Sequence, residues 1–254
     1  MLLEQYYIIR RHEEAWFDLF LFSTINVVVF GLIARYLADK SDPNVASSVI
    51  LGMLLWEVVR IAQYCITINS LWELWSRNLA NIFITPISIF EYVLSYAISS
   101  LFLTGTVFIS LGIVARLFFN FDVTDIGLAV LPVAFVELFV FAWAIGVVLV
   151  GLIFRFGTRI NAISWGAIFL LQPLSATFFP VAVLPRPVQI IARGLPTTYV
   201  FEEARRALVL GHPHWSGLGI AFVLDAMYLT LGCAVFSRLY RSARVSGQFA
   251  RSDV

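Results

Sequence analysis

The sequence has few charged residues. Of its 254 residues, 13% are Asp, Glu, Lys or Arg, whereas 60% are hydrophobic. Soluble domains are about half apolar and about a quarter charged, so this composition excludes an ordinary soluble protein and indicates a membrane protein. The 17 basic and 16 acidic residues nearly cancel. No excess of positive charge is therefore left for binding nucleic acid, and we expect no nucleic-acid partner.

The motifs of nucleotide, metal and redox chemistry are also missing. No GxxxxGK[ST] stretch occurs, so the chain has no phosphate-binding loop of its own for ATP. It has neither an HExxH nor a CxxC motif. His212 and His214 flank a proline and could approach one metal ion, but such a loop pair is more often unliganded. We therefore expect no catalytic residue, no metal and no cofactor on this chain.

Long apolar runs dominate what is present. A helix needs about 20 apolar residues to cross the hydrocarbon of a bilayer. Six segments meet this requirement: 17–38, 45–68, 90–115, 126–154, 161–184 and 217–240. Arginines in RFGTR (155–159) and RLYRSAR (238–244) lie beside span ends, and such residues favour the cytoplasm. The sequence predicts an all-α membrane protein with six transmembrane helices and both termini cytoplasmic, in the plasma (inner) membrane.

Two further segments fit neither spans nor simple loops. Residues 1–15 mix aromatic, aliphatic and charged side chains, which is typical of a helix lying in the membrane interface. Six of the nine prolines fall in 173–213, between apolar pieces too short to cross. This pattern predicts a re-entrant helical hairpin over 185–211 on the outer face. Its second helix would carry a Glu202–Arg206 pair and end at Gly211.

Charged residues inside the predicted spans are candidates for function, because burying them in hydrocarbon is costly. Glu57, Arg60 and Tyr64 lie on one face of the second span. They can line a transport path, or they can form a neutralised pair that fixes helix packing. Glu137 and Asp225 have no cation nearby in their own spans. Three carboxylates against one arginine would suit a cationic or proton-linked substrate.

Residues 69–85 are unusually polar for a segment between two spans. Ser70 followed by Glu73 has the spacing of a capping box, and Glu73 and Arg77 have that of an i,i+4 pair. Apolar residues recur on one face at helical spacing. We therefore expect a short amphipathic helix on the cytoplasmic face. It can be a simple membrane-surface helix, or it can receive force from a soluble partner.

Two stretches carry a family resemblance. WELWSRNLANIFITPISIFEY (72–92) resembles the cytoplasmic segment of ABC-2 type transporter permeases. The region from Gln172 to Gly211 resembles the same family through a P-L-S-x-x-F-F-P stretch followed by L-P-x-T-Y-x-x-E-x-x-R. The matching residues are Pro173, Leu174, Ser175, Phe178, Phe179, Pro180, Pro196, Thr198, Tyr199, Glu202 and Arg205. Thr197 departs from the family, where leucine is more usual.

The resemblance implies a permease subunit that dimerises and docks separate ABC ATPase subunits, which would bind the ATP and Mg²⁺. It implies that 69–85 is a coupling helix with the contact residues Trp72, Glu73, Trp75, Arg77 and Asn78. It implies an outer gate of Phe178, Phe179, Pro180, Tyr199, Glu202 and Arg205. From their depth in the predicted spans, the candidates for the translocation path are Glu57, Arg60, Tyr64, Glu137 and Asp225, and membrane lipids would surround the protein.

The expected function is export of a hydrophobic or amphipathic compound such as a drug, an antibiotic or a lipid. Export of a lipid-linked polysaccharide, of the O-antigen or teichoic-acid type, is the alternative within the same class. An ATP-independent channel or carrier would leave 69–85 without a coupling role. An intramembrane enzyme would need a catalytic pair at one depth, and the sequence shows none.

Overall fold

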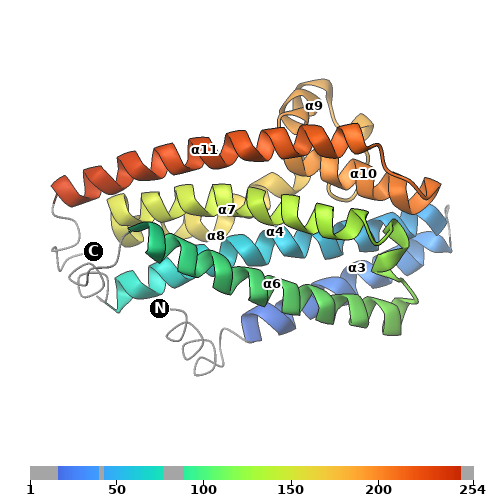
Figure 1. The fold of residues 1–254 in the computed structure, drawn as a ribbon. Helices are drawn as coiled ribbons and strands as arrows, with labels where there is room; N and C mark the ends of the chain where they lie inside the picture. The colour runs from blue at the N-terminus through green and yellow to red at the C-terminus, as the bar shows by residue number, and fades with distance from the viewer. Residues whose placement is uncertain (1–16, 40–42, 77–88, 247–254) are drawn as a thin grey trace.

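The computed structural model describes residues 17–39, 43–76 and 89–246, and over these residues the chain is helical without β-strands (Figure 1). Among the described residues, five helices are long and apolar enough to cross a membrane. They are α3 (Phe22–Ala38, continuing a π-helical turn η1 at Phe17–Leu21), α4 (Pro43–Trp75), α6 (Ile89–Phe119), α7 (Val130–Phe156) and α11 (Trp215–Val245). The predicted class, a helical multi-pass membrane protein, is confirmed at this level.

Helix α4 is the centre of the bundle. It contacts α3, α6, α7, α8 and α10, and 89% of its most apolar window is buried. Its 33 residues make a rod about 50 Å long, longer than the hydrocarbon of about 30 Å. A helix that is apolar on all sides is expected in such a central place. By contrast, only 22–28% of the corresponding windows of α3, α6 and α11 is buried, so these helices form the outer surface.

The predicted fifth span, 161–184, is not one long helix. A 3₁₀ turn η3 (Gly157–Ile160) leads into α8, which runs from Asn161 to Leu174 and is about 21 Å long. Pro173 lies in its last turn, and the chain then bends with Ala176 at a φ of +51°. Proline removes a backbone donor and disfavours helix at the residue before it. The apolar run is therefore interrupted before it can cross the bilayer as a single helix.

The predicted separate helix at 69–85 is also corrected over the residues that the structure describes. Helix α4 passes through 69–75 without a break, and the Ser70 hydroxyl donates to the Ile66 carbonyl 2.9 Å away, inside the helix. Ser70 is thus not an N-cap. No glycine or proline occurs between Arg60 and Trp75, so nothing ends the helix there. Residues 77–85, and the predicted interfacial helix at 1–15, lie outside the described residues.

The region expected to form a hairpin contains two short helices. After a 3₁₀ turn η4 (Val181–Val183), α9 spans Arg186–Arg193 and α10 spans Pro196–Leu210. Gly211 ends α10 in the left-handed region, with φ +77°, and its N–H donates to the Ala207 carbonyl, as predicted. Figure 1 shows α9 and α10 away from the end of the bundle at which α4 and α11 finish.

A short polar connection joins α6 to α7. The 3₁₀ turn η2 (Val123–Ile126) is capped by Asp122, whose carboxylate accepts from the Thr124 backbone N–H and hydroxyl. These hydrogen bonds hold the pKa of Asp122 below its ordinary value, and the Arg116 guanidinium adds to the effect. The Arg116–Asp122 ion pair is exposed to solvent, unlike the ion pair on α4 described next.

Candidate functional site

The midpoint of α4 carries a buried ion pair. Arg60 Nη2 lies 2.6 Å from Glu57 Oε2, and Arg60 Nε donates to the same oxygen at 2.9 Å. Arg60 Nη2 also donates to the Ser23 hydroxyl on α3, and the Asn26 side chain donates to Glu57 at 3.3 Å. The i,i+3 pair predicted from the sequence is therefore present. It is electrically neutral as a unit and joins α3 to α4.

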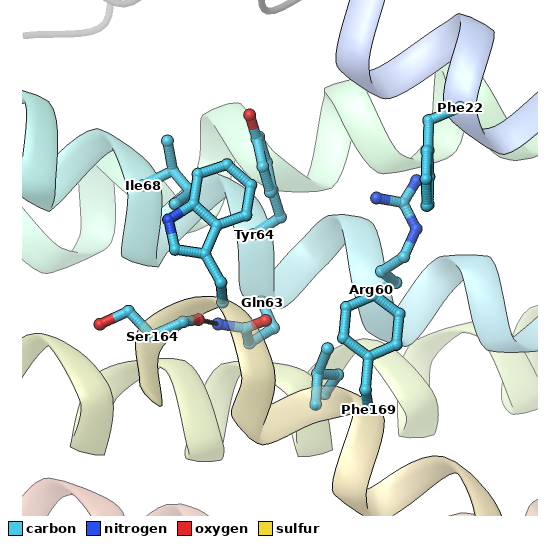
Figure 2. A pocket seen from close by; sticks show the side chains of 9 residues that line it. Phe22, Arg60, Gln63, Tyr64, Ile68, Ser164 and Phe169 are labelled. Carbon is cyan, nitrogen blue, oxygen red and sulfur yellow. Dashed lines mark hydrogen bonds between the residues drawn. The ribbon is translucent and has the colours of Figure 1, made fainter. Parts of the chain in front are cut away.

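A cavity of about 220 Å³ adjoins this pair (Figure 2). Helices α3, α4 and α8 form its walls. Its lining residues are Phe22, Arg60, Gln63, Tyr64, Ile68, Ser164, Trp165, Ile168 and Phe169. Figure 2 shows the Arg60 guanidinium facing the Phe22 ring, whose centroid is 5.1 Å from the guanidinium carbon.

The cavity combines hydrogen-bonding groups with aromatic rings. The Gln63 amide spans from α4 to α8, donating to the Thr67 hydroxyl at 2.8 Å and to the Ser164 carbonyl at 3.2 Å. The Tyr64 ring meets the Trp165 ring edge to face, with centroids 5.4 Å apart. A concave site with apolar walls and a few fixed polar groups is the usual form of a small-molecule site.

The rim of the cavity is open at its aromatic side. Phe22, Trp165 and Phe169 are 46%, 41% and 48% exposed. In a membrane protein such exposed rings on outer helices face lipid or a second chain. A molecule dissolved in the bilayer could therefore reach the polar floor formed by Arg60 and Gln63 without crossing water.

The residues expected to form an outer gate hold the bend after α8 against α10. Arg205 Nη1 donates to the carbonyls of Ala176 and Thr177, at 3.0 and 3.1 Å. The Glu202 carboxylate accepts from the Val181 backbone N–H at 3.1 Å. Burial lowers the pKa of Arg205 to about 10, against a smaller rise from Glu202, so its guanidinium remains charged at neutral pH.

The aromatic members of this group do not converge on one constriction. Phe178 stacks on Phe30 of α3, with centroids 4.6 Å apart and planes 15° apart. Phe179 packs instead on the small apolar cluster beneath α9, and Pro180 is exposed. The Tyr199 hydroxyl donates to the Arg193 carbonyl at the end of α9. These residues fix the hairpin to the bundle.

The predicted Glu202–Arg206 pair is wrong. Arg206 instead contacts Glu203, with Nη1 3.1 Å from Oε1, because Glu202 faces the bend at Val181. The Glu203 carboxylate also accepts from the His214 backbone N–H at 2.7 Å. The His214 ring lies against Arg206, so it contacts a cation rather than a set of metal ligands.

Glu73, expected on a solvent-facing coupling surface, is buried at 7% exposure. Its carboxylate accepts from the hydroxyl of Tyr92 at 2.6 Å and from that of Tyr96, so it ties the end of α4 to the start of α6. Trp72 and Trp75 are 47% and 41% exposed, and their rings meet edge to face 5.2 Å apart. They present an aromatic surface at this end of α4.

Four predicted site residues remain: Arg77, Asn78, Glu137 and Asp225. Arg77 and Asn78 lie outside the described residues. Glu137 on α7 and Asp225 on α11 are buried, at 5% and 2% exposure. Neither is in an ion pair within the described residues. They are close enough to each other for their charges to interact. They do not line the cavity beside Arg60.

Sequence reasoning missed several residues of these sites. Gln63 and Ser164 meet across 101 positions, and Tyr92 and Tyr96 reach Glu73 across 19 and 23. The position of Gln63 in the middle of an apolar span could have indicated a buried polar contact. Tyr92 and Tyr96 lie near the end of a span, where aromatic residues are common, so the sequence did not indicate their contact with Glu73.

Comparison with known proteins gives no assignment: the chain matches no protein-family model and no sequence among the curated proteins.

Proposed function

We propose that this protein is the permease subunit of an ATP-driven exporter for hydrophobic or amphipathic compounds. The observation that carries the proposal is the cavity between α3, α4 and α8. It lies halfway along the most buried helix of a membrane bundle, it has a polar floor at Arg60 and Gln63, and its aromatic rim is exposed. This form suits a molecule that enters from the bilayer and carries one polar group.

The energy source is proposed from the sequence. The chain has no phosphate-binding loop, so ATP would be hydrolysed by a separate ABC ATPase subunit, as the resemblance of 72–92 to ABC-2 permeases implies. Trp72 and Trp75 support this, because they offer exposed aromatic surface next to that segment. We place this end of α4, and both chain termini, in the cytoplasm, and we propose that two copies assemble in the plasma membrane.

The buried place of Glu73 changes which variants test the coupling. Replacing Glu73 would disturb the junction between α4 and α6, so lost activity would not show contact with an ATPase. Trp72→Ala and Trp75→Ala remove exposed side chains instead. Trp215→Ala is the matched control, because Trp215 is 55% exposed at the start of α11, the opposite end of the bundle.

The experiment uses the full chain co-expressed with a candidate ABC ATPase subunit and reconstituted in lipid vesicles. We expect the Trp72 and Trp75 variants to reduce co-purification of the ATPase and its ATP hydrolysis several-fold, and Trp215→Ala to change neither. Equal association and turnover in all three variants would refute the coupling surface. For the cavity, Trp165→Ala should weaken stimulation of ATP hydrolysis by amphipathic compounds while leaving association intact.

A further inference from the structure

The two carboxyl groups between α7 and α11, of Glu137 and Asp225, lie apart from the cavity on which the exporter proposal rests. Within the described residues, Glu137 Oε2 and both carboxyl oxygens of Asp225 are buried without a hydrogen-bond partner. A charged carboxylate without a partner is costly to bury in a protein interior, and more so at the centre of a membrane. Something must compensate the charge of these groups.

The packing of α7 on α11 places the two groups at one level. The rings of Phe141 and Tyr228 meet with centroids 5.6 Å apart. Glu137 precedes Phe141 by one turn, and Asp225 precedes Tyr228 by one turn, so each acid lies on the same face of its helix as the adjacent ring. The two carboxyls are therefore neighbours across the helix interface, which agrees with the interaction between their charges.

Within the described residues, neither acid is in an ion pair with a cation. The cations on α7 and α11 themselves are distant: Arg155, Arg238, Arg241 and Arg244 lie about 20 Å or more along their helices from the acids. On neighbouring helices, Arg60 pairs with Glu57 on α4, Arg116 of α6 pairs with Asp122, and Arg206 of α10 pairs with Glu203. Also on α10, Glu202 accepts from the Val181 backbone N–H, and Arg205 Nη1 donates to the carbonyls of Ala176 and Thr177. Arg205 Nη2 is buried without a hydrogen-bond partner in the described residues.

Four other side-chain atoms are buried without a hydrogen-bond partner in the described part of the chain: Trp56 Nε1 on α4, Thr104 Oγ1 on α6, and Thr198 Oγ1 and Arg205 Nη2 on α10. The Gly194 carbonyl, between α9 and α10, accepts from the Tyr228 hydroxyl of α11, and Glu203 of α10 contacts Gly217 near the start of α11. Thr198, between these two contacts, is level with the turn of α11 that holds Asp225.

We propose that Glu137 and Asp225 form a proton-binding site between α7 and α11, which holds at least one proton at neutral pH. A proton is favoured over a metal ion, because no group of three or more His, Cys, Asp or Glu side chains gathers within the described residues, and hard cations take six or more oxygen ligands. Loss of the bound proton leaves two like charges in hydrocarbon and forces α7 away from α11. The site does not depend on the exporter function.

The test is infrared spectroscopy of the full-length protein in lipid bilayers, titrated from acid to alkaline pH in H₂O and D₂O. A band of protonated carboxylic acid should persist at neutral pH and shift in D₂O. It should decrease in Glu137→Gln and in Asp225→Asn and be lost in the double variant. Asp125→Asn, which changes an exposed carboxyl before α7, is the control and should leave the band unchanged.

Thermal unfolding against pH is the second measurement. The amide variants resemble the protonated acids in shape and charge, so they should fold and match the wild type at neutral pH. As pH rises, the wild type should lose stability and the double variant should lose less. No carboxylic acid band at neutral pH, or a band that the two substitutions leave unchanged, overturns the proposal. Stabilisation by Na⁺ in place of a protonated band overturns it as well.

Discussion

Removing one member of the Glu57–Arg60 pair is the most informative perturbation of the bundle. In Glu57→Gln the side chain keeps its shape, but Arg60 is left charged at 7% exposure in the middle of α4. Breaking a buried pair typically costs about 3–5 kcal/mol, and an unpaired arginine at mid-membrane costs about 2.5–3.5 kcal/mol on insertion scales. The Ser23 hydroxyl remains as one acceptor for Arg60. We therefore expect a loss of about 3 kcal/mol in the free energy of unfolding.

The double variant Glu57→Gln, Arg60→Met separates charge from shape. It removes the uncompensated cation, so it should recover to within about 1 kcal/mol of the wild type, since neutral replacements of a buried pair are often tolerated. The assay is reversible unfolding by SDS titration in mixed micelles, followed by circular dichroism. Arg116→Met at the exposed pair is the control and should have a far smaller effect, because solvent screens that pair. A double variant no more stable than Glu57→Gln would refute this reasoning.

Three further predictions concern close contacts, and thermal unfolding of the purified protein checks each. Gly52→Ala should destabilise the fold, because the added Cβ would clash with the Thr177 carbonyl. In Gly105→Ala the added Cβ meets nothing within 4 Å, so this variant should stabilise α6 by up to about 1 kcal/mol. Equal effects of the two substitutions would contradict this packing. Arg205→Lys should lower the midpoint, because an ammonium cannot reproduce the planar guanidinium that binds two carbonyls; an unchanged midpoint would count against that bridge. Tyr96→Phe should cost about 1.5–3 kcal/mol by removing a donor from the buried Glu73 carboxylate, and a cost near zero would mean that the hydroxyl is not needed there.

The sequence predicted the features that depend on local patterns. In the described part of the chain, long apolar runs located five helices that are long enough to cross a membrane. The spacing of Glu57 and Arg60 predicted their contact, and the glycine after α10 predicted the helix end at Gly211. Each of these depends on residues within a few helical turns. Composition and spacing are sufficient for such features, because helix geometry relates near neighbours directly.

The features that failed depend on residues distant in the sequence. Ser70 and Glu73 have the spacing of a cap, but Tyr92 and Tyr96 bury the carboxylate and α4 continues past it. The preference of Glu202 for Val181 over Arg206 likewise follows from the bend after α8. Local propensity gave no information on these contacts, because tertiary packing overrides it.

The continuity of α4 has a mechanical consequence. Glu73 and Arg60 are 13 residues apart on one helix without a glycine or proline between them, a separation of about 20 Å along a stiff rod. If α4 pivots near Arg60, a tilt of about 10° displaces the Glu73 end by about 3.4 Å at this radius. Because Tyr92 and Tyr96 bind that end, α6 is carried along with it. A displacement of the Glu73 end of α4 would thus rotate the part of α4 that carries Arg60 and forms one wall of the cavity.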